Sequence, residues 1–467
     1  MVGCQPGIRR VVELLHRWVW GPWALILLMG TGLWFTLAGR FFQIRGMRCW
    51  WRCTMGKVLH SEQTRTPKSG ITPFQAMCTA LAATIGTGNI AGVATAIAAG
   101  GPGAVFWMMI AALLGSMTCF AEQVLGHLYR WRDGSGRWHG GAMAYLERGL
   151  HSPFLARLYA LLCVCSTLGM GDLVQVHSIA SLVQQNSRAS PVAVGAVLAA
   201  LATLVILGGV QRIAGVTQTL VPVMGLGYVC MALAVVAAHA RQIPAALGLV
   251  VRSAFSPRAG VGGAAGYTVA CALRTGVARG VFSNEAGLGT SVLAHVETSE
   301  TDPAAQGMWG IFQVFADTLI VCTLTALAIL TSGVYDTSVY GQALGTAAFS
   351  ALSNGAALTA SAFGTVFGAW GPRLIGLELG LFAFSTVLAS AYFGSTCAEY
   401  LLGRRAVPVY QVVFLVLMVV GSALQLELVW QLSDVFNGLM LLPNLVGVMA
   451  LSRPVRQQLR RARNDLE

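Results

Sequence analysis

Only 10% of the 467 residues are charged and 55% are hydrophobic, whereas soluble globular domains carry about 25% charged residues. The composition excludes a water-soluble fold, and continuous apolar runs of about 20 residues exclude a β-barrel, whose strands alternate in polarity. The net charge of +12 does not indicate nucleic-acid binding, because the Lys and Arg residues fall between the apolar runs, where they orient a membrane protein.

The apolar runs predict an all-α polytopic membrane protein with about eleven transmembrane helices. The first run is long enough to cross a bilayer and shows no small-residue cleavage site, so a signal peptide is not expected. We expect spans at 20–42, 72–100, 103–129, 153–184, 191–209, 216–239, 264–297, 305–331, 372–402, 406–424 and 427–451.

The basic residues between the spans predict an inner-membrane orientation. Loop 43–71 and the tail 452–467 are rich in Lys and Arg and are expected in the cytoplasm, where they could also contact anionic lipid. The stretch 332–370 has no Lys or Arg and is expected outside, as is the N-terminus. Three arginines oppose the last assignment: Arg9, Arg10 and Arg17.

The second span, 72–100, contains a predicted helix break, because residues 86–89 read GTGN and each glycine costs a helix interior about 1 kcal/mol relative to alanine. Freed backbone groups are tolerated at bilayer depth only where they line a cavity or hold a ligand. Carbonyls near Thr84 suit a hard cation, and amides at the start of the outer half-helix suit a carboxylate. Thr87 and Asn89 add side-chain oxygens.

Three other interpretations of this segment stay open. Gly86, Gly88 and Ala91 match a dinucleotide fingerprint, but the strand and the soluble βαβ unit that the fingerprint needs are not visible. The glycines could instead serve close helix packing. The hydroxyls of Thr84 and Thr87 could bond back to their own helix.

The fourth span, 153–184, contains Asp172, Gln175 and His177. These side chains are costly at bilayer depth unless they face the protein interior. Asp172 and Gln175 are three residues apart and therefore share a helix face. His177 is either a proton site or a packed, hydrogen-bonded ring.

The seventh span, 264–297, contains a second predicted break at Ser283-Asn284-Glu285. An acid at membrane depth is a functional candidate, and we expect Glu285 to be a gate or scaffold residue rather than a ligand. The structural alternative is an ion pair with an arginine of the same span, Arg274 or Arg279.

The two broken spans predict an internal repeat. After the first span, ten remain, and each group of five opens with a broken one, so the two halves would face opposite ways, as in many secondary transporters. The expected division is an N-terminal helix and cytoplasmic loop at 1–71, a first repeat at 72–239, a connecting loop at 240–263, a second repeat at 264–451 and a basic tail at 452–467.

The ninth span, 372–402, contains Ser385, Thr386 and Ser390. Adjacent hydroxyls suit Na⁺, and residues 386 and 390 share one helix face. The alternative is that these hydroxyls serve helix packing.

Together these stretches resemble the alanine/glycine:cation symporter family. The similar segments are ATIGTGNIAGVATAI at 83–97, GGPGAVFWM at 100–108, GGAMAYLERGL at 140–150, RGVFSNEAGLGTS at 279–291 with His295, LFAFSTVL at 381–388 and CAEYLLG at 397–403. The resemblance implies a leucine-transporter-like fold with ten core helices after one extra N-terminal helix, and transport of small neutral amino acids with Na⁺ or sometimes H⁺.

The resemblance also implies site residues. The substrate site would comprise Thr87, Gly88, Asn89, Gln175, Ser283, Asn284, Thr386 and Ser390. His177 is a further candidate that comes from the polarity of its own span and not from the resemblance. One Na⁺ would lie between the carbonyls of Thr84 and Ile85 and the hydroxyls of Ser385 and Thr386.

Five positions depart from the family pattern. Met109 and Ser390 stand where tryptophan is common, Asp172 where asparagine is usual, Ser395 where glutamate is usual, and His177 where another residue is usual. Replacing a ring with Ser390 predicts a larger, more polar pocket, so Ser390→Trp should shift preference toward alanine.

We therefore predict a secondary symporter that takes up alanine or glycine with Na⁺ by alternating access. A larger or more polar amino acid, or H⁺ coupling, is the alternative. A channel or a sensor would differ in showing no gradient-driven accumulation. A membrane enzyme is not expected, because the loops show no nucleophile–base or metal-ligand constellation.

Overall fold

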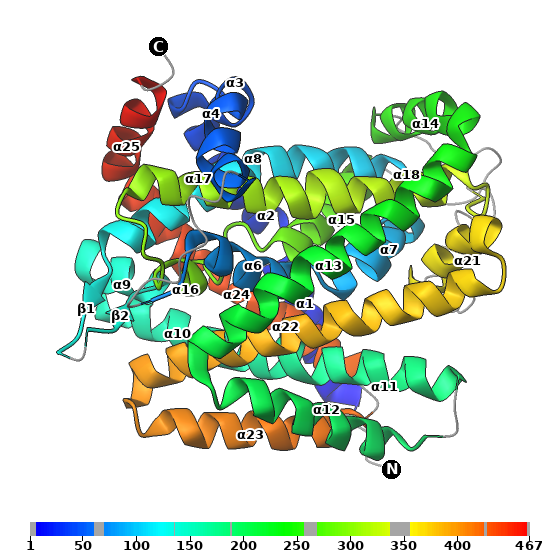
Figure 1. Cartoon of the computed structure of the whole chain (residues 1–467). Coiled ribbons are helices and arrows are strands. Elements are labelled where there is room, and N and C mark those ends of the chain that lie inside the picture. Colours follow the sequence, from blue (N-terminus) through cyan, green and yellow to red (C-terminus); the bar gives the residue numbers. More distant parts are fainter. Residues whose placement is uncertain are drawn as a thin grey trace.

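The computed structural model describes residues 6–59, 70–134, 136–186, 189–255, 269–336, 355–424 and 427–464. Within these residues the chain is almost entirely helical, with one short hairpin (Figure 1). Seven helices of the described residues are long and apolar enough to cross a membrane, and a bent pair makes an eighth: Leu14–Ala38, Gly103–Leu128, Pro153–Gln184, Gly209–Ala238, Pro303–Thr331, Trp370–Leu402, Gln431–Ala450, and Pro73–Thr84 with Gly88–Gly100.

The elements follow the chain in three groups. The N-terminal group is α1 (Pro6–Val19), α2 (Pro22–Ala38), α3 (Phe42–Arg45), α4 (Met47–Trp51) and α5 (Lys57–Leu59). The next group is α6 (Pro73–Thr84), α7 (Val93–Gly100), α8 (Gly103–Leu128), β1 (Trp131–Arg132), β2 (Trp138–His139), α9 (Ala142–Ala144), α10 (Pro153–Leu168), α11 (Val174–Asn186), α12 (Pro191–Ile206), α13 (Gly209–Ala238) and α14 (Ile243–Phe255). The last group is α15 (Val269–Asn284), α16 (Val292–His295), α17 (Pro303–Val314), α18 (Thr323–Thr331), α21 (Gly355–Phe367), α22 (Trp370–Leu402), α23 (Ala406–Gly421), α24 (Glu427–Ala450) and α25 (Ser452–Asn464).

Several of these helices are joined by π-helical turns, which are often found at functional sites. They occur at Arg52–Gly56, Gly88–Gly92, Tyr145–Gly149, Gly169–Leu173 and Phe315–Cys322, and a short 3₁₀ turn covers Ala240–Gln242. The turns therefore make continuous spans of α10 with α11 and of α17 with α18.

The first broken span is built from a capped half-helix and a bend. Thr72 caps α6 by accepting a bond from the Gln75 amide (3.1 Å), and the Gln75 side chain accepts one from the Thr72 amide (2.9 Å). The helix ends at Thr84, because Ile85 has an extended ψ of 94°. The chain resumes at 88 with a change of direction of 52°, so the predicted break at 86–89 is confirmed.

The second broken span is opened by left-handed backbone. After α15, Glu285, Gly287 and Gly289 have φ values of 54°, 95° and 73°, which only glycine adopts without strain. Asn444 of α24 secures this segment by donating to the carbonyl of Gly287 (2.7 Å) and to Glu122 Oε1 of α8 (2.5 Å). The break predicted around residue 285 is therefore present.

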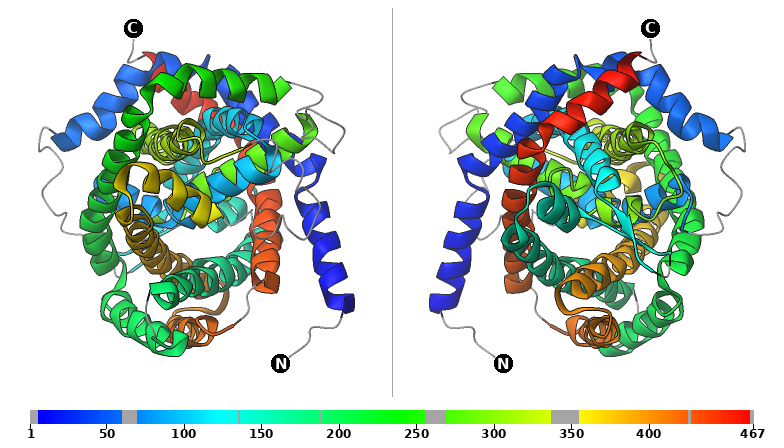
Figure 2. Two further views of the ribbon diagram at one scale, coloured as in Figure 1. Left: turned by 90° about the vertical axis from the view of Figure 1, so that its right-hand side faces the viewer. Right: turned by 90° about the vertical axis from the view of Figure 1, so that its left-hand side faces the viewer.

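The long helices run in more than one direction: α8 and α17 appear nearly end-on in Figure 2, whereas α1, α13 and α24 run across the view. Helix α8 packs against α7, α15 and α17, and α22 packs against α6, α10, α13, α16 and α21. Each broken span therefore contacts both α8 and α22. The chain is thus an all-α polytopic membrane protein with both breaks inside the bundle.

Each expected span coincides with at least one helix, but three stretches differ from expectation. Helix α14 occupies most of the expected loop 240–263, and α21 lies within the stretch 332–370. The basic tail forms α25, whose buried face packs on α8 and α17. Residues 60–69 with Arg65 and Lys68, residues 256–268 and residues 337–354 lie outside the described part of the chain.

Candidate functional site

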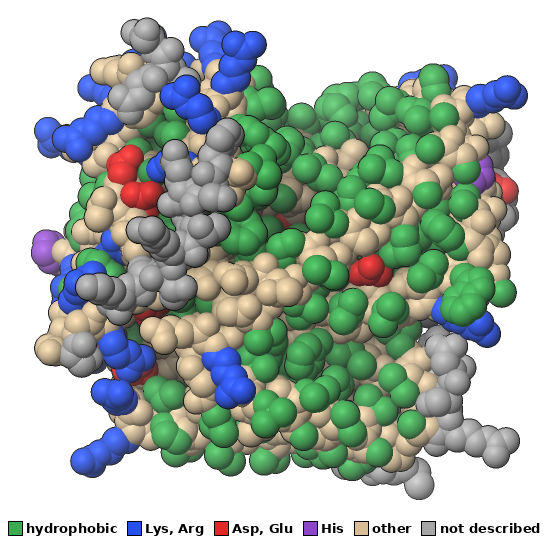
Figure 3. Space-filling view, viewed as in Figure 1, with side chains coloured by type: hydrophobic (Ala, Val, Ile, Leu, Met, Phe, Trp, Pro, Cys, Tyr) green, Lys and Arg blue, Asp and Glu red, His purple; other side chains and the backbone are tan. Residues whose placement is uncertain are grey.

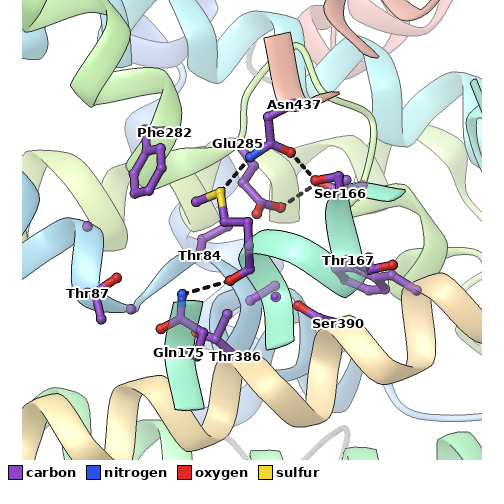
Figure 4. Close-up of a pocket in the computed structure, with 17 residues that line it drawn as sticks. Thr84, Thr87, Ser166, Thr167, Gln175, Phe282, Glu285, Thr386, Ser390 and Asn437 are labelled. Atoms are coloured by element: carbon purple, nitrogen blue, oxygen red, sulfur yellow. Dashed lines mark hydrogen bonds between the residues drawn. The ribbon is translucent and has the colours of Figure 1, made fainter. Parts of the chain in front are cut away.

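A polar cavity lies where the two broken spans meet α10, α11, α22 and α24 (Figure 4). Its volume is about 30 Å³, and one water needs about 10–15 Å³ on the same measure. The lining comprises Ala83, Thr84, Gly86, Thr87, Gly88, Ser166, Thr167, Met170, Gly171, Gln175, Phe282, Glu285, Thr290, Thr386, Ser390, Phe393 and Asn437. The conformation is closed, with room for about two waters.

Two buried polar atoms in the lining have no partner among the described residues. They are Thr87 Oγ1 and Gln175 Oε1, on side chains that are 4% and 2% exposed. The Gln175 amide nitrogen donates to the Met170 carbonyl (3.2 Å), which fixes the amide with its oxygen free. Buried polar atoms are normally hydrogen-bonded, so these two are ready to bind a polar ligand.

The hydroxyls of α22 meet the end of the first half-helix. Ser385 Oγ and Thr386 Oγ1 donate to the Ala82 carbonyl at 3.3 and 3.0 Å. A Cβ at Gly86 would lie 3.0 Å from Thr386 Oγ1, so glycine permits the close approach. The C-terminal end of a helix carries partial negative charge, and this junction gathers the oxygen atoms that a hard cation prefers.

Ser390 lines the cavity, but the larger pocket expected there is absent from this conformation. Gly171 packs directly on Ser390, and a Cβ at position 171 would clash with the Ser390 side chain. The space beside Ser390 is therefore occupied by the fourth span. The identity of residue 390 alone could not show this contact.

Four predicted substrate residues lie outside the cavity lining, and three of them, Asn89, Ser283 and Asn284, stabilise the helix breaks instead. Asn89 Oδ1 accepts from the Gly86 amide (2.9 Å), and Asn89 Nδ2 donates to Asp317 Oδ1 (2.8 Å). Ser283 Oγ donates to Asp317 Oδ2 (2.9 Å), and Asn284 Nδ2 donates to Thr318 Oγ1 (3.1 Å).

Asp317 therefore joins the two broken spans through one buried carboxylate. It lies in the π-helical turn after α17, is fully buried, and also accepts a bond from Thr318 Oγ1 (2.7 Å). Our sequence analysis missed this residue. The signal was available, because an acid within an apolar span is a functional candidate.

His177 and Glu285 have different surroundings from those weighed in the sequence. His177 lies outside the cavity lining, and its ring lies against the backbone of Gly421 in α23. Glu285 lines the cavity, and its Oε2 accepts a bond from Thr290 Oγ1 (2.5 Å). Among the described residues it forms no ion pair with either arginine of α15.

Phe282 separates the central cavity from a second one, because it lines both. The second cavity has a volume of about 280 Å³ and is lined by residues of α1, α7, α15 and α24, including Arg274, Arg279 and Asp434. The Arg279 guanidinium lies 5.4 Å from the Phe282 ring centre. Figure 4 shows Phe282 beside Thr87, across the cavity from Ser390.

The opposite end of the site is closed by backbone and side-chain contacts. The Tyr392 hydroxyl donates to the Leu293 carbonyl (3.1 Å). Arg130, just after α8, donates to the carbonyls of Val296 (3.0 Å) and Thr298 (2.7 Å) and stacks on Trp138, 3.9 Å from the ring centre. Burial and the nearby Arg132 lower the pKa of Arg130 to about 10.

The chain matches the model of the sodium:alanine symporter family over residues 5–466. It is 38% identical to the sodium/alanine symporter AgcS of Methanococcus maripaludis, over 95% of this chain and 94% of that protein. It is 34% identical to the probable sodium/glutamine symporter GlnT of Bacillus subtilis, over 97% of this chain and 90% of that one.

An uncharacterized transporter of Haemophilus influenzae is 39% identical over 97% of this chain and 95% of its own length. Among solved structures, a Na⁺-coupled sialic acid symporter in a substrate-bound outward-open state aligns with a TM-score of 0.52 at 12% identity. That alignment covers 92% of this chain and 86% of the other. The fold is therefore shared with a Na⁺-coupled symporter.

Proposed function

Because the chain belongs to the sodium:alanine symporter family, a family of transporters and not of enzymes, we propose that it takes up a small neutral amino acid, alanine or glycine, together with Na⁺. One observation carries the proposal. The cavity at the meeting point of the two broken spans contains two buried, unpartnered polar atoms, Thr87 Oγ1 and Gln175 Oε1.

The proposed substrate pose follows from the polarity of the lining. The helical segment Gly88–Gly100 begins at the cavity, and the amides at its start suit the substrate carboxylate. The Thr87 hydroxyl adds a donor to that carboxylate. The free Gln175 Oε1 accepts a hydrogen bond from the ammonium group of the substrate. Thr386 and Ser390 enclose the end of the cavity that receives the substrate side chain.

Asn89, Ser283, Asn284 and His177 act in this proposal without touching the substrate. The first three hold the broken backbone through Asp317 and Thr318. Their role is positioning, because the cavity loses its shape if either break relaxes.

The Na⁺ is placed between the carbonyls of Thr84 and Ile85 and the hydroxyls of Ser385 and Thr386. The support is the contact of both hydroxyls with the Ala82 carbonyl at the same helix end. A bound cation would draw α6 and α22 together, and so favour the closed arrangement of the cavity. This linkage would make amino-acid binding depend on Na⁺.

We propose alternating access as the mechanism. An amino acid has more heavy atoms than the two waters that fit the present cavity, so the helices must separate before it binds. Phe282 closes the side toward the second cavity, and Tyr392 with Arg130 closes the other. Opening one closure at a time exposes the site to one side of the membrane. The units 72–239 and 264–451, each opening with a broken span, would move as inverted repeats.

The orientation we propose places the C-terminus in the cytoplasm and the N-terminus outside an inner membrane. Figure 3 shows most of the Lys and Arg side chains at the end of the molecule that carries α25, α4 and the β1–β2 hairpin, with a few at the opposite end near α14 and α21, while the middle is largely apolar. Positive charge favours the cytoplasmic side. Arg17 in α1 counts against this orientation, as it did in the sequence.

A larger or more polar substrate is the second candidate. A relative at 34% identity is named as a probable glutamine symporter, so family membership leaves the side chain open. Because Gly171 packs on Ser390, Ser390→Trp would also push two spans apart. Ser390→Ala is the gentler companion variant, since it changes only the hydroxyl.

The test is competition in proteoliposomes with an inward Na⁺ gradient and labelled alanine. Unlabelled alanine and glycine are expected to compete better than glutamine. Stronger competition by glutamine would replace the first candidate by the second. Absence of Na⁺-driven uptake of every amino acid tried would remove both.

A further inference from the structure

Asp172 is a buried carboxylate that the proposed transport mechanism does not use. It lies in the π-helical turn Gly169–Leu173, which joins α10 to α11, and is 0% exposed. Among the described residues, neither Oδ1 nor Oδ2 has a hydrogen-bond partner. Asp317, also fully buried, accepts three side-chain hydrogen bonds instead.

This isolation determines the charge of Asp172 in the closed conformation. An ionised carboxylate without partners in a protein interior costs many kcal/mol, and such groups neutralise instead. A Na⁺ ion would need several further oxygen ligands, and none of the described residues is hydrogen-bonded to the carboxylate. A proton needs only the carboxylate oxygen itself.

The helices around Asp172 bring one titratable side chain of the described residues into electrostatic interaction with it. The turn packs against α10, α11, α22, α23 and α24. From these helices, Tyr410 of α23 interacts electrostatically with Asp172. Three further titratable groups of these helices have contacts of their own among the described residues. His177 lies against Gly421, Asp434 lies 3.5 Å from His16, and Cys163 contacts Cys397.

The position also links Asp172 to the cavity. The preceding residue, Gly171, lines the cavity and packs on Ser390. The Tyr410 hydroxyl lies 2.9 Å from Thr167 Oγ1, and Thr167 lines the cavity as well. Any separation of α22 from the π-helical turn, which cavity opening requires, changes the packing around Asp172.

We propose that Asp172 binds a proton when the site closes and releases it when the site opens, so that the transport cycle responds to pH. On closing, the carboxylate takes a proton from a hydronium ion of the bathing solution: an O–H bond of hydronium breaks, one forms on the carboxyl oxygen, and the charge of Asp172 changes from −1 to 0. On opening, water reaches the turn, the carboxyl O–H bond breaks, and the proton returns to water as hydronium. This inference rests on the proposed transport function, because it assigns the proton to the same cycle.

The test compares the wild-type protein with Asp172→Asn, which keeps the shape of the side chain and removes the acid. Alanine uptake is measured in proteoliposomes with a fixed Na⁺ gradient, at equal pH inside and outside, from about pH 6 to about pH 8.5. We expect the wild-type rate to change several-fold, up to ~10-fold per pH unit for one proton. Asp172→Asn should still transport, with less than ~2-fold change over the range.

Two further variants keep the test decisive. His177→Gln removes a second titratable group of the same span, and it should keep the wild-type pH profile whatever its rate. Asp172→Ser replaces Asp172→Asn if the latter is not recovered folded. A pH profile that Asp172→Asn shares with the wild-type protein would overturn the proposal.

Thermal unfolding of the purified protein separates this inference from the proposed function. The wild-type midpoint should fall more steeply than that of Asp172→Asn as pH rises, because only the wild-type folded state holds the extra proton. If neither protein shows Na⁺-driven uptake, the transport proposal fails while this comparison still decides proton binding. Equal slopes would refute proton binding at Asp172, and unequal slopes with pH-independent uptake would refute its coupling to transport.

Discussion

The carboxylate of Asp317 is predicted to hold the two broken spans in register. It accepts hydrogen bonds from Asn89 Nδ2 (2.8 Å), Ser283 Oγ (2.9 Å) and Thr318 Oγ1 (2.7 Å). A buried donor left without its partner costs about 1–3 kcal/mol, and Asp317→Ala leaves three donors without their shared acceptor. We therefore expect Asp317→Ala to lower the free energy of unfolding by about 3–5 kcal/mol and to abolish uptake.

A double-mutant cycle distinguishes the shared hydrogen bonding to Asp317 from an ordinary loss of packing. Asn89→Ala and Ser283→Ala remove partners of the same carboxylate, so their effects should be non-additive by about 0.5–3 kcal/mol. The matched control is Ser178→Ala, because among the described residues Ser178 Oγ donates within its own helix, to the Val174 carbonyl (2.8 Å). The assay is denaturant or thermal unfolding in detergent, alongside Na⁺-driven uptake. Additive effects of Asn89→Ala and Ser283→Ala on the free energy of unfolding would refute the claim that Asp317 holds the two broken spans together.

Three other predictions concern the cation, the substrate and the closure. Thr386→Ala should raise the Na⁺ concentration for half-maximal uptake by about tenfold or more, because the loss of one oxygen ligand should cost at least ~1.4 kcal/mol of Na⁺ binding free energy. An unchanged Na⁺ dependence would show that Thr386 is not part of the ion site. Gln175→Leu should raise the alanine KM by about tenfold, because it removes a hydrogen bond to a charged group that is worth ~1.5 kcal/mol. The Na⁺ dependence of uptake, measured at saturating alanine, should not change. Arg130→Lys keeps the charge but loses the forked contacts to the carbonyls of Val296 and Thr298. It should lower the free energy of unfolding by about 1–3 kcal/mol. Thermal unfolding curves of this variant and of the control Arg132→Lys would measure the difference.

The positions of the helix breaks could be predicted from the sequence because glycines and small polar residues stand out in an apolar run. The segments at 86–89 and around 285 are both broken in the structure. The resemblance to a symporter family was likewise confirmed. Local composition carries this information, since a helix interior disfavours such residues regardless of distant contacts.

The contacts of the site could not be predicted, because they depend on packing between residues distant in sequence. Asn89 and Ser283 both meet Asp317, and nothing in the sequence near either residue indicates the third. Ser390 indicated a larger pocket, and the close approach of Gly171 removes that space. The amphipathic α14 was expected as a loop, because a short helix on the surface lacks the length of a span.

The most direct test of the account is alanine accumulation in proteoliposomes when Na⁺ is present outside and absent inside. Wild-type protein should accumulate alanine above the external concentration, and replacement of Na⁺ by K⁺ should abolish the accumulation. Thr386→Ala should recover part of its uptake at high Na⁺. Accumulation that persists without Na⁺, or equilibration without accumulation in the Na⁺ gradient, would contradict Na⁺-coupled symport by this chain.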